Sequence, residues 1–266
     1  YKGSVSIPSL TFISDAEVVY HAGLKSKFVD INKETLCVDE DNFNCMPTNF
    51  AGVKAKAYGK VIDSCHRIEK DDVKGSDSFW CYSFYATKNM STVQGGMIAL
   101  NDKDAYEWLL LARDHGTTKG TLQRYTGKNP SYDIAFPAWR VKPDDLRAAI
   151  GIEQLKKLPA INKRRNEIVA RYNQKLGYNR TGNHLYPIFV EDRDDFIKDM
   201  FEKGVQCSVH FPLIHKFTAY KDDSVNLPVS EWVGPRICSL PLFPAMTNEE
   251  VDYVCSLVLK SNKLIV

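Results

Sequence analysis

The sequence predicts an α/β protein with a mainly parallel sheet in a large domain, followed by a smaller C-terminal α+β domain. Two patterns indicate this fold class. A strand, a helix and a second strand within about the first thirty residues are typical of a βαβ unit and a parallel sheet, and strands alternate with helices in the last third of the chain. The 266 residues are enough for both domains. We place the large domain at residues 1–158 and the long helix with the small domain at residues 159–266.

In the first half, short apolar runs predict strands, and apolar residues at helical spacing predict helices. Gly23 is placed to end the first helix, and Gly95 and Gly96 allow a tight turn before the last strand of this half. The expected strands are residues 4–7, 27–31, 58–62, 79–86 and 97–100, and the expected helices are residues 15–21 and 102–113.

A long, partly irregular connection is expected at residues 114–139, because this stretch is rich in Gly, Thr, Lys, Pro and Tyr. The elements expected after it are helices at 146–158 and 161–176, a strand at 184–190, a helix at 193–203, strands at 205–211 and 237–240, and a helix at 248–259.

The charge and the apolar runs limit the classes of partner. With 35 Lys and Arg against 33 Asp and Glu, the net charge of +2 gives no electrostatic reason to expect nucleic acid or an anionic membrane as a partner. No apolar run approaches the ~20 residues that span a bilayer, and the first residues do not form a signal peptide. A cytoplasmic protein is the default expectation. The seven cysteines, an odd number without a Cys-x-x-Cys pair, are expected to be reduced.

A lysine follows a predicted buried strand whose residues are mostly aromatic or β-prone. Lys88 lies just past residues 79–86, where an amine can lose solvation, have its pKa lowered and become a nucleophile that forms a Schiff base. Asp63 ends the preceding strand, and the carboxyl ends of parallel strands border one crevice. The commoner alternatives are a solvated lysine, a turn-capping Asp63 and a structural imidazole at His66.

Several short motifs, in order along nearly the whole chain, resemble one family. They are IPSLTF at residues 7–12, DSCH at 63–66, SFYATKN at 83–89 with Gly95-Gly96, SVHFP at 208–212 and SLPLFP at 239–244. This series resembles the DegT/DnrJ/EryC1/StrS aminotransferases, pyridoxal-phosphate enzymes of fold type I that mostly aminate keto-sugars attached to nucleotides.

The resemblance implies a role for five residues around pyridoxal 5'-phosphate. Lys88 would form a Schiff base with the cofactor and then act as the base that moves the proton. Asp63 would pair with the pyridine nitrogen and keep it protonated. His66 would contact the ring or its phenolic oxygen, Phe12 would stack on the ring, and Ser83 would donate its hydroxyl to the phosphate.

The resemblance also implies a substrate and an assembly. His210 and His215 lie in a proline-containing loop that matches the region of the family near the sugar, although either could instead cap or pack. We therefore expect a nucleotide-sugar substrate, an amino-acid donor, with glutamate the expected one, and a homodimer with sites at the subunit interface. A metal site is not expected, because no acidic or cysteine partner lies at ligand spacing.

Two alternatives stay open at this point. Relatives that dehydrate sugars share the fold, but they typically have histidine where this chain has Lys88. The family also has a segment before the first strand here whose helix start binds the cofactor phosphate, and we expect that segment to be missing from this chain. A non-catalytic remnant that serves as a binding or regulatory protein is the second alternative. Titration with pyridoxal phosphate separates the readings, because a remnant shows no saturable spectral change.

Overall fold

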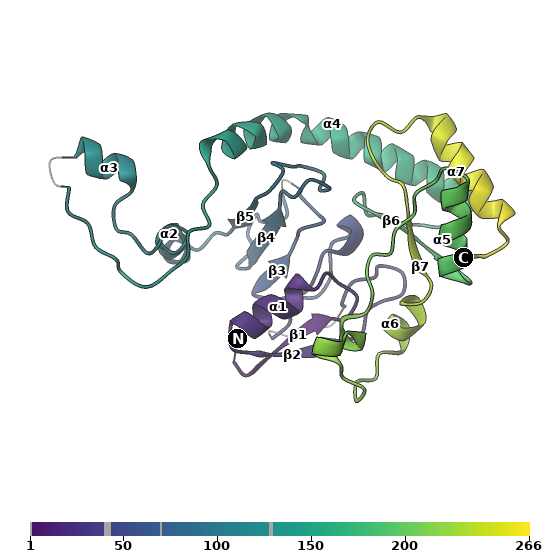
Figure 1. The fold of residues 1–266 in the computed structure, drawn as a ribbon, viewed down its shortest axis with the longest axis horizontal. Coiled ribbons are helices and arrows are strands. Elements are labelled where there is room, and N and C mark those ends of the chain that lie inside the picture. Colours follow the sequence, from purple (N-terminus) through teal and green to yellow (C-terminus); the bar gives the residue numbers. More distant parts are fainter. Residues whose placement is uncertain (1, 40–43, 70, 128–129) are drawn as a thin grey trace.

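The computed structural model describes residues 2–39, 44–69, 71–127 and 130–266, and its longest element is a helix that runs along one side (Figure 1). This helix, α4 (Asp145–Leu176), has 32 residues and links the N-terminal strands to the C-terminal helices and strands. Helices α2 (Lys103–Ala112) and α3 (Thr121–Thr126) lie on an arm that extends from the rest of the molecule (Figure 1).

The first elements form the predicted βαβ unit. Strand β1 (Ser4–Pro8) pairs in parallel with β2 (Lys25–Val29), and α1 (Ser14–His21) connects them. Ile7 and Val19 are almost fully buried in one cluster, because β1 and one face of α1 are apolar. The prediction of a parallel strand pair joined by a helix is therefore confirmed.

The sheet continues through short pairings. Isolated parallel bridges join Ser6 to Cys45 and Thr48 to Asp63, so the chain between β2 and β3 lies between the two groups of strands. Strand β3 (Val61–Asp63) pairs in parallel with β4 (Phe79–Ser83), and β5 (Gly96–Ala99) pairs antiparallel with β4. The fold is thus α/β with parallel pairing through most of the N-terminal strands.

The turn between β4 and β5 requires glycine. Gly95 has a φ of +149°, and a Cβ at Gly96 would lie 2.6 Å from the carbonyl oxygen of Tyr82 on the neighbouring strand. Both positions exclude a side chain, the first for its backbone conformation and the second for its close approach. The tight turn predicted from the Gly-Gly pair is present.

Helix α4 differs from the prediction of two helices. Asp144 caps its N-terminus by accepting a hydrogen bond from the backbone N–H of Arg147, and Gly177 ends it in a left-handed conformation with φ +76°. Pro159 lies inside it without ending it, although proline removes one backbone donor. The predicted boundary between residues 158 and 159 therefore falls within one helix.

The residues after α4 form a second sheet of order β7-β6-β8, which is antiparallel throughout. The prediction of a strand at residues 205–211 is wrong, because this segment makes only one isolated bridge, from Ser208 to Ser239. The elements of this part are β6 (Tyr186–Val190), α5 (Arg193–Glu202), η2 (Ile214–Lys216), η3 (Thr218–Tyr220), α6 (Pro228–Val233), β7 (Ile237–Leu240), α7 (Asn248–Lys260) and β8 (Leu264–Ile265).

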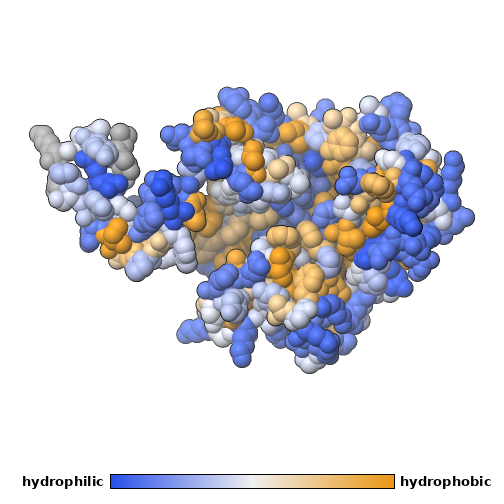
Figure 2. All heavy atoms as spheres, viewed as in Figure 1, coloured by the Kyte–Doolittle hydropathy of each residue, from blue (hydrophilic) through white to orange (hydrophobic). Residues whose placement is uncertain are grey.

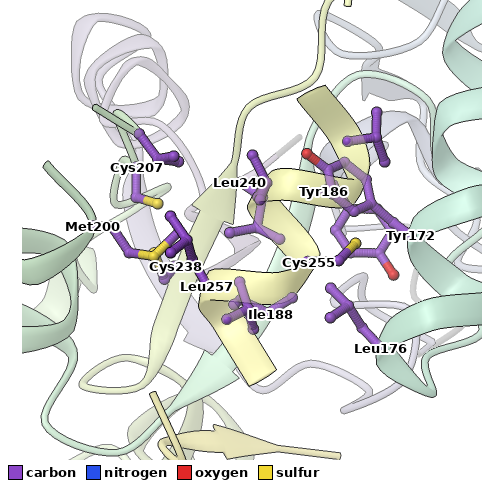
Figure 3. Packing of buried hydrophobic residues seen from close by; sticks show 14 of the residues in the cluster. Tyr172, Leu176, Tyr186, Ile188, Met200, Cys207, Cys238, Leu240, Cys255 and Leu257 are labelled. Carbon is purple, nitrogen blue, oxygen red and sulfur yellow. The ribbon is translucent and has the colours of Figure 1, made fainter. Parts of the chain in front are cut away.

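The largest buried cluster packs α4, α5 and α7 on this second sheet. Figure 3 shows Tyr172 of α4 beside Tyr186 of β6, with ring centroids 4.6 Å apart, and Ile188 close to α7. Arg171 also reaches α7, where its Nε and Nη2 each donate to Asp252 at 2.6 Å. These contacts fix the second half of α4 on the C-terminal sheet, which is why the helix continues past Pro159.

The face shown in Figure 2 is mostly polar, with apolar side chains gathered in its central region. The arm also exposes large aromatic side chains, among them Tyr125 at 85% and Trp139 at 77% of their full accessibility. None of the seven cysteines, all of which lie in the described ranges, is in a disulfide bond. Within the described ranges, no helix has the length and apolar character required to cross a membrane.

Candidate functional site

Asp63 and Lys88 lie at the same edge of the N-terminal sheet. Asp63 is the last residue of β3 and is paired with Cys81 of the parallel strand β4. The chain leaves β4 at Ser83 and turns at once, with the backbone N–H of Lys88 donating to the carbonyl of Tyr85 at 3.0 Å. Because β3 and β4 run in the same direction, their carboxyl ends bring the two side chains to one region.

The Lys88 amine is partly buried, and this burial lowers its pKa. Desolvation is the largest effect, and the interactions of the amine with the Cys65 thiol and the Asp63 carboxylate act in the opposite direction. In the part of the chain that the structure describes, none of the salt bridges involves Lys88. A larger fraction of this amine is therefore neutral and nucleophilic than in an exposed lysine.

His66 is a buried neutral imidazole beside this pair. The backbone N–H of Ala51 donates to Nδ1 of His66 at 3.3 Å, so Nδ1 is an acceptor and the ring proton is on Nε2. Burial, and then the charge of Lys88, hold the pKa of His66 well below its usual 6.5. Nε2–H of His66 is thus a neutral hydrogen-bond donor near physiological pH.

Aromatic rings extend the cluster toward solvent. Phe211 lies 5.9 Å from the His66 ring, 6.2 Å from Phe50 and 5.6 Å from Phe12, measured between centroids. Phe12 is 54% exposed, so one part of its ring is open. Of these rings, Phe12 and His66 are expected from the sequence, whereas Phe211 is brought in by a loop more than 140 positions further along the chain.

His184 is a site residue that the sequence reasoning missed. Its ring lies 4.4 Å from that of His66 at an angle of 37°, and its Nδ1–H donates to Oδ1 of Asn89 at 2.9 Å. Burial, together with the charge of Lys88, holds the pKa of His184 well below 6.5. Asn89 directly follows Lys88, so this contact links the loop that carries the amine to the start of β6.

The Asn89 amide also reaches α4 and the segment before His184. Its Nδ2 donates to Oδ1 of Asn162 and to Oδ1 of Asn183, each at 3.1 Å. The only signal in the sequence is the asparagine next to Lys88, because its partners are 73 to 95 positions away.

His210 and His215 are placed differently. Nδ1 of His210 lies 3.0 Å from Oγ of Ser239, and burial with the charge of Lys88 lowers the pKa of His210. The His210 ring also lies 5.1 Å from that of Phe211, which in turn contacts His66 in the cluster around Lys88. His215 is fully buried with Nδ1 2.6 Å from Oγ of Ser9, and the structure does not bring it into this cluster. Its predicted contact with substrate stays a prediction.

Ser83 ends β4 and is half-buried. Its Oγ accepts a hydrogen bond from the backbone N–H of Tyr85 at 3.3 Å, which leaves the hydroxyl proton available for another acceptor. Among the residues described, no group of three or more His, Cys, Asp or Glu side chains is arranged to hold a metal ion. Together these side chains offer an activated amine, a carboxylate, neutral imidazoles and an aromatic face.

Comparisons with known proteins agree on one family and one fold. The model of the DegT/DnrJ/EryC1/StrS aminotransferase family matches residues 2–63 and 61–259. Among solved structures, PseC of Helicobacter pylori, an aminotransferase involved in the biosynthesis of pseudoaminic acid, has a TM-score of 0.85 at 20% identity, covering 98% of this chain and 80% of that one.

Two further structures match in the same way. A DegT DnrJ EryC1 StrS aminotransferase from Brucella abortus has a TM-score of 0.83 at 24% identity, over 97% of this chain and 79% of that one. The sugar aminotransferase CalS13 from Micromonospora echinospora has a TM-score of 0.83 at 21% identity, over 97% and 80%. At these identities the structures establish the shared fold.

Proposed function

Because the chain belongs to the DegT/DnrJ/EryC1/StrS aminotransferase family, whose cofactor is pyridoxal 5'-phosphate, we propose that it transfers an amino group from glutamate to a nucleotide-linked keto-sugar. The observation that best supports this function is the meeting of Lys88, Asp63 and His66 at one edge of the sheet, with the pKa of the amine lowered by burial. The fold is that of fold type I enzymes.

The residues at this edge fit the cofactor by their chemistry. An amine of lowered pKa, a carboxylate, a neutral N–H donor and an open aromatic face match the aldehyde, ring nitrogen, phenolic oxygen and ring plane of pyridoxal phosphate. When bound, the cofactor supplies an aldehyde that condenses with amines and a ring that withdraws electrons from the bond to be broken.

Lys88 has two tasks in this proposal. Its Nζ attaches the cofactor while no substrate is present, which requires the neutral amine that burial favours. Once the amino donor has taken its place, the same Nζ would be free to act as the base that carries the proton between the substrate and the cofactor. Both tasks need a lysine whose amine is not held in a salt bridge.

Four other residues hold the cofactor in this proposal. Asp63 keeps the ring nitrogen protonated as its carboxylate partner, and His66 donates Nε2–H to the phenolic oxygen. Phe12 covers the ring face, and the Ser83 hydroxyl donates to the phosphate. His184, whose ring is tilted by 37° against that of His66, holds that imidazole in place.

The proposal also includes a substrate and an assembly. His210 lies beside Phe211 of the cluster around Lys88, which supports its assignment to the sugar. Sugar aminotransferases among the structural neighbours support a keto-sugar acceptor. We further propose a homodimer, which the aromatic side chains exposed on the arm around α3 favour.

The test compares Lys88→Ala with Lys74→Ala, a matched change at an exposed lysine of the same half of the chain. Wild type and Lys74→Ala are expected to develop a saturable visible absorbance band with pyridoxal phosphate and to transfer an amino group from glutamate to a nucleotide-linked keto-sugar. Lys88→Ala is expected to lose both. A band that persists in Lys88→Ala contradicts the role of Lys88, and its absence from wild type supports a non-catalytic remnant.

A further inference from the structure

A second carboxyl group lies behind Asp63. Asp15, in the first turn of α1, is only 4% exposed, and its carboxyl group lies close enough to that of Asp63 for the two to interact electrostatically. The bridge between Thr48 and Asp63 brings β3 close to α1 at this point. Both carboxyl groups line one cavity of about 400 Å³ whose other walls are largely apolar, among them Val19, Met46 and Val61.

The contacts of Asp15 indicate which of its oxygens carries a proton. Oδ2 accepts hydrogen bonds from Oγ1 of Thr11 at 2.7 Å and from Oγ1 of Thr48 at 2.8 Å. Because Oδ2 accepts from two hydroxyl groups, it does not itself carry a proton. A proton on Asp15 is therefore on Oδ1, from which it can be donated to the carboxylate of Asp63.

Two carboxyl groups that face one buried, largely apolar cavity disfavour being ionised together, because burial penalises charge and like charges repel. Burial and the charge of Asp63 accordingly raise the pKa of Asp15. The other titratable groups nearby are the Cys65 and Cys81 thiols, whose pKa values burial and these carboxylates also raise, and Lys88 beyond Asp63. Asp63 also accepts from the backbone N–H of Cys65 at 2.8 Å on Oδ1.

We propose that Asp15 is a positioning residue that stays protonated and donates to Asp63, so that the pair carries one negative charge and Asp63 presents it at the sheet edge beside Lys88. This inference rests on the proposed function, in which Asp63 is the carboxylate that faces the cofactor ring. Thr11 and Thr48 hold Asp15 in the orientation that makes this donation possible.

The first test uses the protein without cofactor. Urea denaturation at a series of pH values gives the folding constants of wild type, Asp15→Asn and Asp195→Asn, the last an exposed first-turn carboxylate of α5. Folded wild type keeps a proton that the unfolded chain releases above pH about 4. The folding constant of Asp15→Asn relative to wild type should therefore rise by up to about tenfold per pH unit until the raised pKa is passed.

Asp195→Asn should show no such change relative to wild type. If the ratio of the folding constants of Asp15→Asn and wild type does not depend on pH, Asp15 does not keep a proton in the folded protein, and the proposal is wrong. This measurement does not involve the cofactor, so it tests the carboxyl pair whether or not the protein binds pyridoxal phosphate. Failure of wild type to bind pyridoxal phosphate would refute the proposed function and leave the result on the carboxyl pair unaffected.

The second test measures the affinity for pyridoxal phosphate by its visible absorbance. The amide that Asp15→Asn introduces can still donate to Asp63 and accept from both threonines, so the dissociation constant should stay within about threefold of wild type. Asp15→Ala has no donor, and its affinity should fall about tenfold or more. Equal losses in the two variants contradict a positioning role through the donated hydrogen bond.

Discussion

The Asn89 amide makes the polar connection between the Lys88 loop and the C-terminal half of the chain, and its removal tests this connection. Asn89→Ala deletes the acceptor for the His184 Nδ1–H at 2.9 Å and the donor to Asn162 and Asn183 at 3.1 Å each. The three bonds contribute about 1 kcal/mol each, and leaving the buried His184 N–H unpaired costs about 1–3 kcal/mol. Partial relaxation reduces the sum, so we expect a loss of about 2–4 kcal/mol in the free energy of unfolding.

Asn101→Ala is the matched control. Asn101 also donates two hydrogen bonds from Nδ2, to the carbonyls of Val73 and Ser76 at 2.7 Å, but it is exposed and water can replace them. Its loss should cost about 1 kcal/mol or less. Urea denaturation followed by fluorescence and by circular dichroism gives both values, provided that the two transitions coincide. A loss for Asn89→Ala no larger than that for Asn101→Ala refutes the connection.

Two further predictions concern acid stability and the C-terminal core. Burial depresses the pKa values of His66 and His184 in the folded protein, so unfolding takes up protons below pH 6.5 and stability should fall as the pH decreases from there to the depressed values. His184→Gln should flatten this dependence in thermal denaturation between pH 5 and 7, roughly the range in which histidine titrates, and an unchanged slope contradicts neutral burial. Ile188 is fully buried in the cluster of Figure 3, so Ile188→Ala should lower the free energy of unfolding by about 2–5 kcal/mol and Ile188→Val by about 1 kcal/mol. Similar losses for the two variants would contradict close packing around this side chain.

Local sequence patterns were sufficient to predict those parts of the fold that depend on residues close together in the chain. The βαβ unit at residues 4–29 is predicted because its strands and helix each bury one apolar face. The convergence of Asp63 and Lys88 follows from two parallel strands that end at one edge. The role of these two residues at the cofactor is a proposal that the resemblance to the family supports.

The extended segment at residues 205–211 shows why a correct pattern can give a wrong element. Val205 and Cys207 are buried in the C-terminal core, whereas Val209 and Phe211 pack on a second cluster. Every second residue of this segment thus packs on one of the two clusters, which produces the period of two that is typical of a strand. The segment pairs with β7 only at Ser208, so the alternation of apolar residues predicted a strand where the structure has a single bridge.

Other features depend on contacts between residues far apart in the chain. The sequence prediction ends one helix at residue 158, and the packing of Tyr172 and Leu176 on the second sheet accounts for its continuation through Pro159. His184 reaches His66 across more than a hundred positions, and no local pattern around it differs from that of an ordinary buried strand. In the sequence, Asp15 has the position of an ordinary carboxylate in the first turn of a helix, and only the structure shows that it lies close to Asp63.

The central claim is that the Lys88 amine is the group that holds the cofactor, and chemical trapping tests it most directly. The protein is incubated with pyridoxal phosphate, reduced with borohydride, digested and mapped by mass spectrometry. We expect one modified peptide, the one that contains Lys88, and none after Lys88→Ala. Modification of a different lysine, or equal labelling of many exposed lysines, would contradict the account.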